Sequence, residues 1–67
     1  MWTARGAYKD HEGAVRFLQE HSPMWTSRDG LVAEVLRSHP GISHSGSGWY
    51  RWESGDGVER YVVIEEA

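Results

Sequence analysis

The stretch GISHSGSGWYRWESGDG, residues 41–57, decides which fold the chain adopts. It admits either a helix over residues 43–52 or a loop followed by a strand and a tight turn. A helix would contain Gly46 and Gly48, each of which costs roughly 1 kcal/mol relative to alanine inside a helix. The composition therefore favours the second interpretation, in which serine and glycine form a loop.

Residues 49–66 contain the pattern of a β-hairpin. WYRWE and ERYVVIEE are both rich in aromatic or β-branched residues, and the turn sequence SGDG lies between them. We predict a flexible, irregular loop over residues 41–48 and a hairpin over residues 49–65. The second strand is apolar on both faces, which is typical of a covered strand, and the N-terminal stretch MWTARGAY is expected to pair with it as a short edge strand.

Two helices are predicted between these strands. Asp10 is a plausible N-cap for HEGAVRFLQEH, in which Phe17 and Leu18 follow helical spacing. The second helix is expected over residues 27–38, where Thr26 and Asp29 have the spacing of a capping box. The sequence His39–Pro40–Gly41 is expected to end it.

Together these elements predict a small α+β fold in one domain spanning residues 1–67. Two helices would pack on a two- or three-stranded antiparallel sheet that ends in a C-terminal hairpin. The expected core is formed by apolar residues of both helices, Trp25 and one face of the last strand: Phe17, Leu18, Trp25, Leu31, Val35, Leu36 and residues 61–64.

Composition limits the classes of function. The 67 residues carry a formal charge of −3, contain no cysteine and lack any apolar run long enough for a membrane span. The first residues also lack the order of a signal peptide, so we expect a cytoplasmic protein without a membrane partner. A dedicated nucleic-acid-binding protein usually carries a basic surface, which this composition does not favour.

The order of the predicted elements resembles that of a winged helix-turn-helix domain. In this resemblance, residues 24–26 are the short strand, residues 27–38 the second helix and residues 49–65 the wing, while GIS at 41–43 stands where a recognition helix begins. The resemblance implies a DNA-binding regulator. Its available phosphate or base contacts are Arg28, Arg37, Ser43, His44, Ser45, Arg51 and Arg60.

The second hypothesis is a protein of the kind encoded by phages or mobile elements, which binds and inhibits a host protein. It rests on the short acidic chain and on the many aromatic residues, because exposed Trp and Tyr near arginine are typical of protein-binding hot spots. The expected contact residues are Tyr50, Trp52 and Tyr61. DNA and a host protein both remain open as partners at this point.

Catalysis is not expected. HEGAV begins like the metalloprotease motif H-E-x-x-H, but position 15 is valine, so the second metal ligand is missing. No G-x-S-x-G nucleophile motif occurs, and a strand rather than a helix follows GSG, which argues against a phosphate-binding loop. We predict a non-enzymatic protein without a cofactor or bound metal.

Overall fold

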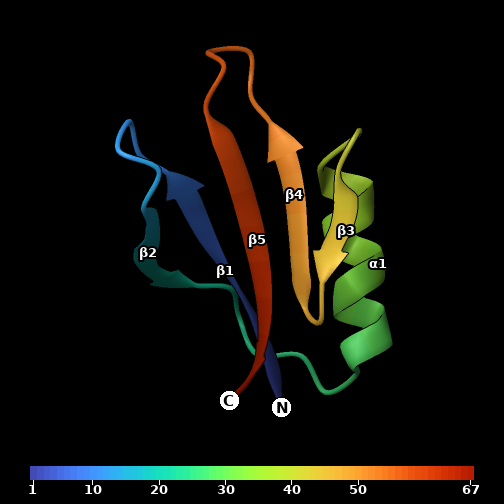
Figure 1. Ribbon diagram of the computed structural model, residues 1–67. Helices are drawn as coiled ribbons and strands as arrows, with labels where there is room; N and C mark the ends of the chain where they lie inside the picture. Colours follow the sequence, from blue (N-terminus) through green and yellow to red (C-terminus); the bar gives the residue numbers. More distant parts are fainter.

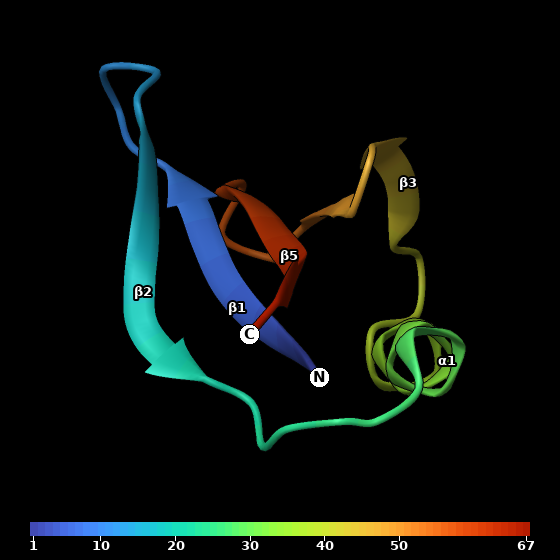
Figure 2. The same cartoon turned by 90° about the horizontal axis from the view of Figure 1, so that it is seen from below.

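The computed structural model describes residues 1–67 as a five-stranded antiparallel sheet with one helix (Figure 1). In chain order the elements are β1 (Trp2–Lys9), β2 (Val15–His21), α1 (Arg28–Ser38), β3 (Ser43–Gly46), β4 (Trp49–Glu53) and β5 (Glu59–Glu66). The spatial order of the strands is β2-β1-β5-β4-β3, and every neighbouring pair is antiparallel. The sheet curves between β2 and β3, with α1 beside β3 and far from β2 (Figure 2).

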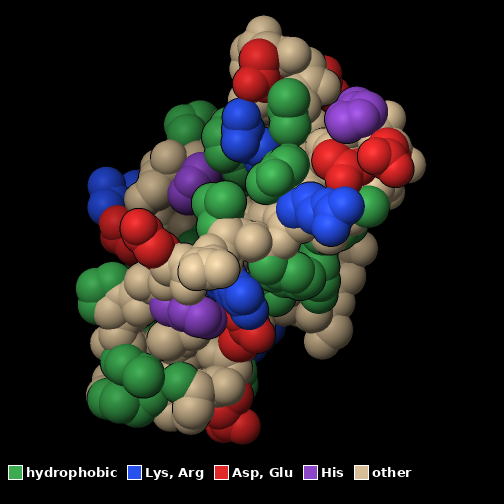
Figure 3. Space-filling view, turned by 90° about the vertical axis from the view of Figure 1, so that its left-hand side faces the viewer, with side chains coloured by type: hydrophobic (Ala, Val, Ile, Leu, Met, Phe, Trp, Pro, Cys, Tyr) green, Lys and Arg blue, Asp and Glu red, His purple; other side chains and the backbone are tan.

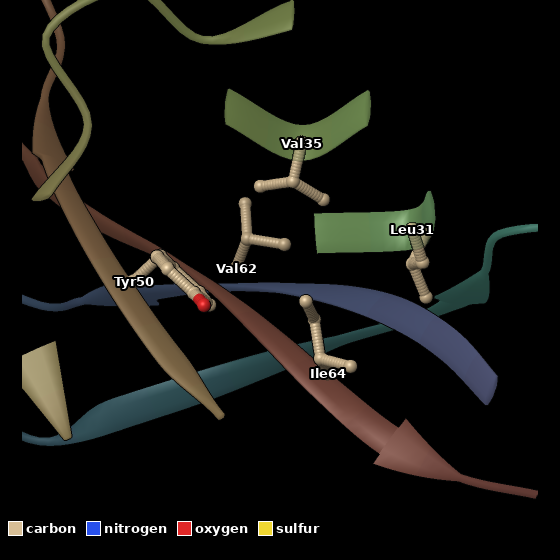
Figure 4. Packing of buried hydrophobic residues seen from close by; sticks show 5 residues of the cluster. All are labelled: Leu31, Val35, Tyr50, Val62 and Ile64. Atoms are coloured by element: carbon tan, nitrogen blue, oxygen red, sulfur yellow. The ribbon is translucent and has the colours of Figure 1, made fainter. Parts of the chain in front are cut away.

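The central strand is β5, because it pairs with β1 on one side and β4 on the other. Its four residues 61–64 are all buried, as expected of a strand that is covered on both faces. Val62 and Ile64 face α1, where they pack with Leu31, Val35 and Tyr50 in the main hydrophobic cluster (Figure 4). The last and first residues also meet, since the Ala67 amide donates to the Met1 carbonyl at 2.8 Å.

The opposite face of the sheet has its own small cluster of aromatic rings. The Trp49 ring lies edge-on against both Phe17 and Tyr61, with centroids 5.6 Å apart in each pair. Phe17 comes from β2 and Trp49 from β4, so their contact spans β1 and β5 and requires the curvature of the sheet. This row of rings covers the buried residue Val63, although no helix lies on this face.

Three predicted elements are confirmed. The helix expected over residues 27–38 is α1, although its N-cap is Ser27, whose hydroxyl accepts from the Gly30 amide at 3.0 Å, and not Thr26. The C-terminal hairpin is formed by β4 and β5, and the N-terminal strand β1 pairs with β5 as expected. The expectation that β1 is a short edge strand is wrong, because β2 pairs with its other side.

The predicted fold class is wrong, because the chain has one helix on a five-stranded sheet instead of two helices on a two- or three-stranded, winged-helix-like sheet. The expected first helix is β2. Asp10, which was expected to cap that helix, caps a turn. One of its carboxylate oxygens accepts from the amides of Glu12 and Ala14, each at 2.9 Å, and Gly13 in the same turn adopts φ +84°. This turn leads the chain back antiparallel to β1.

The expected irregular loop over residues 41–48 is also wrong in its central part. Residues 43–46 form β3, which pairs with β4 through a turn at Gly48. Gly48 has φ +73°, a conformation that glycine adopts without strain, and its carbonyl accepts from the Ile64 amide at 2.8 Å. The turn is therefore fixed to the central strand.

The core prediction is correct only in part. Leu31, Val35 and residues 61–64 are buried, and Trp25 packs partly buried against them. Phe17, Leu18 and Leu36 were also expected in the core, but they are exposed by 43%, 50% and 46%. Phe17 and Leu18 are neighbours on a strand, where successive side chains point to opposite faces, so they cannot form one helical stripe.

Candidate functional site

A groove separates α1 from β2 on the helix-bearing face of the sheet. The helix lies over the β5 and β4 side of this face, whereas β2 lies at the other edge (Figure 2). Two adjoining cavities of about 420 and 280 Å³ occupy the space between them, and both are lined by Gly6, His39 and Val62. We call this hollow the α1–β2 groove.

The floor of the groove is made of small side chains on the two central strands. Ala4 and Gly6 of β1 lie there, opposite Ile64 and Val62 of β5 in the antiparallel register. A Cβ atom at Gly6 would lie 2.9 Å from Cδ1 of Leu18, so the missing side chain lets Leu18 lean over β1. The glycine therefore keeps the floor low and open.

The walls are mainly apolar. Leu18 stands on the β2 side, and Leu31 and Val35 stand on the helix side. Trp25, in the connection between β2 and α1, closes the end of the groove nearest the N-terminus of β1. Its backbone exchanges two 2.8 Å hydrogen bonds with that of Trp2. Such a concave, apolar surface with few polar groups is typical of binding sites.

Polar groups lie at the end of the groove near β4. The His39 ring packs 5.4 Å from the Trp52 ring, and its Nδ1 lies 3.1 Å from the Val35 carbonyl oxygen. The indole N–H of Trp52 is buried and has no acceptor. An unsatisfied buried donor costs about 1–3 kcal/mol, so an acceptor that reached it would be stabilised.

A carboxylate also lines the helix side of the groove. Glu34 accepts from the Arg37 guanidinium and from the Ser38 hydroxyl, and the Arg37 bond is the main reason why the pKa of Glu34 is lowered. Glu34 is therefore ionised at neutral pH. It places a negative charge on the helix side of a hollow that Arg5, Ser22, Ser38 and His39 also line.

The three residues expected to contact a protein do not form one patch. Tyr50 and Trp52 share the helix-bearing face, because they pair with Val62 and Arg60 of β5. Tyr61 lies on the opposite face, and both tyrosines are buried. Trp52 and Tyr61 both line the smaller cavity of the α1–β2 groove, whereas Tyr50 lines neither cavity.

Tyr61 takes part in a charged network on the aromatic face. Its hydroxyl donates to Glu59, which also pairs with Lys9 at 3.1 Å and Arg51 at 3.4 Å. The hydrogen bond to Glu59 raises the pKa of Tyr61, and the same bond, followed by that from Lys9, lowers the pKa of Glu59. This network joins β1, β4 and β5 and leaves Tyr61 little freedom to contact a partner.

The residues expected to contact DNA are distributed over four elements. Two are on α1: Arg37 pairs with Glu34, and Arg28 lies over the Trp2 ring with its guanidinium carbon 5.7 Å from the centroid. On the hairpin, Arg51 pairs with Glu59 and Arg60 pairs with Asp56 at 3.1 Å.

The other three DNA-contact candidates lie on the edge strand β3. Ser43, His44 and Ser45 are exposed there, and the His44 ring packs 5.2 Å from the Tyr50 ring. Ser43 faces the same side as Arg51 because the two residues pair directly. The seven candidates therefore share no single surface, and each arginine among them already has an intramolecular partner.

The floor of the α1–β2 groove is not evident from the sequence. The sequence predicts a strand that contains Ala4 and Gly6. It does not show that these two small residues form the floor of a groove. The available signal was the alternation of MWTARGAY, which puts Trp2, Ala4 and Gly6 on one face. A strand face with such small residues beneath a single short helix leaves room for a hollow.

Comparisons with known proteins assign no family to this chain. No protein-family model, curated protein or solved structure matches it. The helix α1 has 11 residues, and the structure contains no helix with the length and apolar character needed to span a membrane.

Proposed function

We propose that the chain is a non-enzymatic binding protein whose α1–β2 groove takes an apolar segment of a partner protein. The observation that carries this proposal is the open floor of Ala4, Gly6 and Val62 between Leu18 and the helix. A cavity of about 420 Å³ is large enough for one or two large apolar side chains, which are the usual anchors of protein interfaces.

The surroundings of the groove support a peptide over a small nonpolar molecule. The buried Trp52 N–H without an acceptor would be satisfied by a peptide carbonyl after a small movement of side chains. Glu34 on the helix side favours a segment with a basic residue beside its apolar anchor, and that residue would share the carboxylate with Arg37. That the partner is a host protein inhibited by this chain stays a prediction.

Binding of DNA has less support. Arg37, Arg51 and Arg60 are all paired with carboxylates, so phosphate contacts would have to compete with these ion pairs. The regulator hypothesis therefore stays a prediction. It is checked by a gel shift at low salt with mixed duplex DNA.

Selection from a library of random peptides tests the groove. Wild-type protein is expected to enrich peptides with a large apolar residue near Lys or Arg. The substitution Gly6→Val fills the floor and displaces the exposed end of Leu18, whose Cδ1 lies 2.9 Å from the new Cβ position. It suits a strand because Gly6 does not have a positive φ. These peptides should therefore bind Gly6→Val at least about tenfold more weakly, the cost of one lost anchor contact.

A matched control uses the same change on the edge strand β3. A Cβ at Gly46 meets no atom within 4 Å, so Gly46→Val should leave peptide binding unchanged. Equal binding by wild type, Gly6→Val and Gly46→Val would show that the groove is not the binding site. Binding of duplex DNA that weakens with salt, in the absence of peptide enrichment, would favour the regulator instead.

A further inference from the structure

Strand β2 is an edge of the sheet that no part of the chain covers. All seven of its residues are exposed, including Val15, Phe17 and Leu18. Figure 3 views the molecule from this side and shows separate hydrophobic groups between charged side chains. The strand contains neither proline nor lysine, which commonly prevent an edge strand from pairing with another chain.

The backbone of β2 is positioned for such pairing. The groups that point toward β1 belong to even-numbered residues: the Ala14 carbonyl accepts from Asp10, the Leu18 carbonyl accepts from the Arg5 side chain, and the Ser22 amide donates to Ala4. Backbone groups alternate sides along a strand. The register with β1 shifts between Phe17 and His21, where residues 18–20 lie opposite Gly6 alone. The Leu18 and Ser22 groups still point inward across this shift, so the alternation continues and Phe17 and Gln19 direct their amides and carbonyls outward.

Charge then selects one way for two copies to pair. In an antiparallel pair with twofold symmetry, centring on Leu18 sets Phe17 opposite Gln19 and Arg16 opposite Glu20, and each pair occurs twice. Phe17 and Gln19 would exchange the outward hydrogen bonds. Centring on Arg16 or on Glu20 sets like charges opposite each other, which is destabilising.

The two remaining registers are less favourable. Centring on Phe17 or on Gln19 leaves Leu18 opposite a charged side chain, Arg16 in the first case and Glu20 in the second. Only the Leu18 register matches both charges and sets Leu18 against its own copy. In that position the two strands approach most closely, as an apolar pair requires.

We propose that a second copy of this chain pairs with β2 in the Leu18-centred antiparallel register and joins the two sheets into one. Both charged side chains are available for it. Arg16 holds Asp10 within its own copy, but its side chain is 60% exposed and keeps free donors, and Glu20 has no ion-pair partner. Leu18 also forms a wall of the α1–β2 groove, but the pairing can be tested separately from the proposed function, because Glu20 lines neither cavity of the groove.

Sedimentation equilibrium of three samples tests the pairing. Wild-type protein is expected to approach twice the monomer mass of 7.6 kDa as its concentration rises. Glu20→Arg sets two arginines opposite each other at both ends of the interface, so its dissociation constant should rise roughly tenfold or more. Arg16→Glu should weaken pairing in the same way, and a mixture of the two variants should form the heterodimer, because both contacts become complementary again.

Two controls separate loss of pairing from loss of folding. Circular dichroism of Glu20→Arg should match wild type, since Glu20 is exposed and makes no ion pair. Arg16→Glu also breaks the Asp10 pair, so isotope-filtered contacts between the Leu18 methyl groups of two wild-type copies provide an independent readout. A wild-type mass of 7.6 kDa at millimolar concentration, or a dimer that Glu20→Arg does not weaken, would overturn the proposal.

Discussion

The turn between β3 and β4 should be the position least tolerant of a single methyl group. Gly48 has φ +73°, and a Cβ placed there would lie 2.9 Å from the Ile64 carbonyl oxygen. That oxygen belongs to the backbone of the central strand β5, so it cannot move aside as a side chain could. We therefore expect Gly48→Ala to be severely destabilising.

The magnitude has two parts. A left-handed backbone costs a residue with a side chain about 1–2 kcal/mol. Forcing a methyl group against a packed backbone adds about 1–3 kcal/mol. The expected loss of about 2–5 kcal/mol is a large share of the roughly 3–10 kcal/mol that a chain of this length has available.

Urea denaturation of three alanine variants separates these parts. Gly41 has φ +87° but no atom near its Cβ position, so Gly41→Ala should lose only the conformational part, about 1–2 kcal/mol. Gly46 has neither a positive φ nor a close neighbour, and Gly46→Ala should change the free energy of unfolding little. If Gly48→Ala were no worse than Gly41→Ala, the turn would not lie against Ile64 and the β3–β4 hairpin would be misplaced.

Three further predictions concern the turns, the helix and the aromatic row. The pKa of Asp56 is lowered from 3.8 to about 2, mainly by its hydrogen bond from Ser54, so its contribution to stability is present above pH 3.8 and is lost as the pH falls through 2. Asp56→Asn should therefore flatten the acid side of a melting temperature–pH curve, and an unchanged slope would contradict this. Ser27→Ala should cost about 1 kcal/mol in urea denaturation and Thr26→Ala much less, whereas the reverse order would restore the capping box expected from sequence. Phe17→Ala should cost about 1–2 kcal/mol, less than the ~3–5 kcal/mol of a fully buried phenylalanine, because 43% of its surface is exposed. A cost near zero would show that its contact with Trp49 does not contribute.

The helix and the C-terminal hairpin were predictable because their signals are local. A hydroxyl cap and a proline–glycine stop directly flank α1, and an apolar stripe lies within it. The aromatic and β-branched residues of β4 and β5 flank a glycine-containing turn. In both cases the information is contained in fewer than twenty consecutive residues.

Strands β2 and β3 were missed because their structure depends on partners elsewhere. Phe17 and Leu18 fit a helical stripe as a pattern, but the Asp10 turn and pairing with β1 override it. The Ser and Gly residues of β3 have little preference for strands. They are held by β4 and by the contact of Gly48 with β5.

Little of the groove was predictable. Trp52, Arg60 and Tyr61 were expected to contact a partner and line its smaller cavity, but their positions depend on the register of β4 and β5, which also places Tyr50 and Tyr61 on opposite faces. The groove itself arises because α1 covers only part of the sheet. The sequence contains no local sign of where a helix lies across a sheet, so Ala4 and Gly6 could not be recognised as its floor.

Contacts from a selected peptide to two neighbouring valines test the groove most directly. Val62 lines both cavities on the helix-bearing face, whereas Val63 faces the aromatic row on the other side. In isotope-filtered NMR spectra, the apolar side chain of a bound peptide should contact the methyl groups of Val62 and Leu31 and none of Val63. Contacts to Val63 or Phe17 without any to Val62 would place the binding site on the opposite face and contradict the proposal.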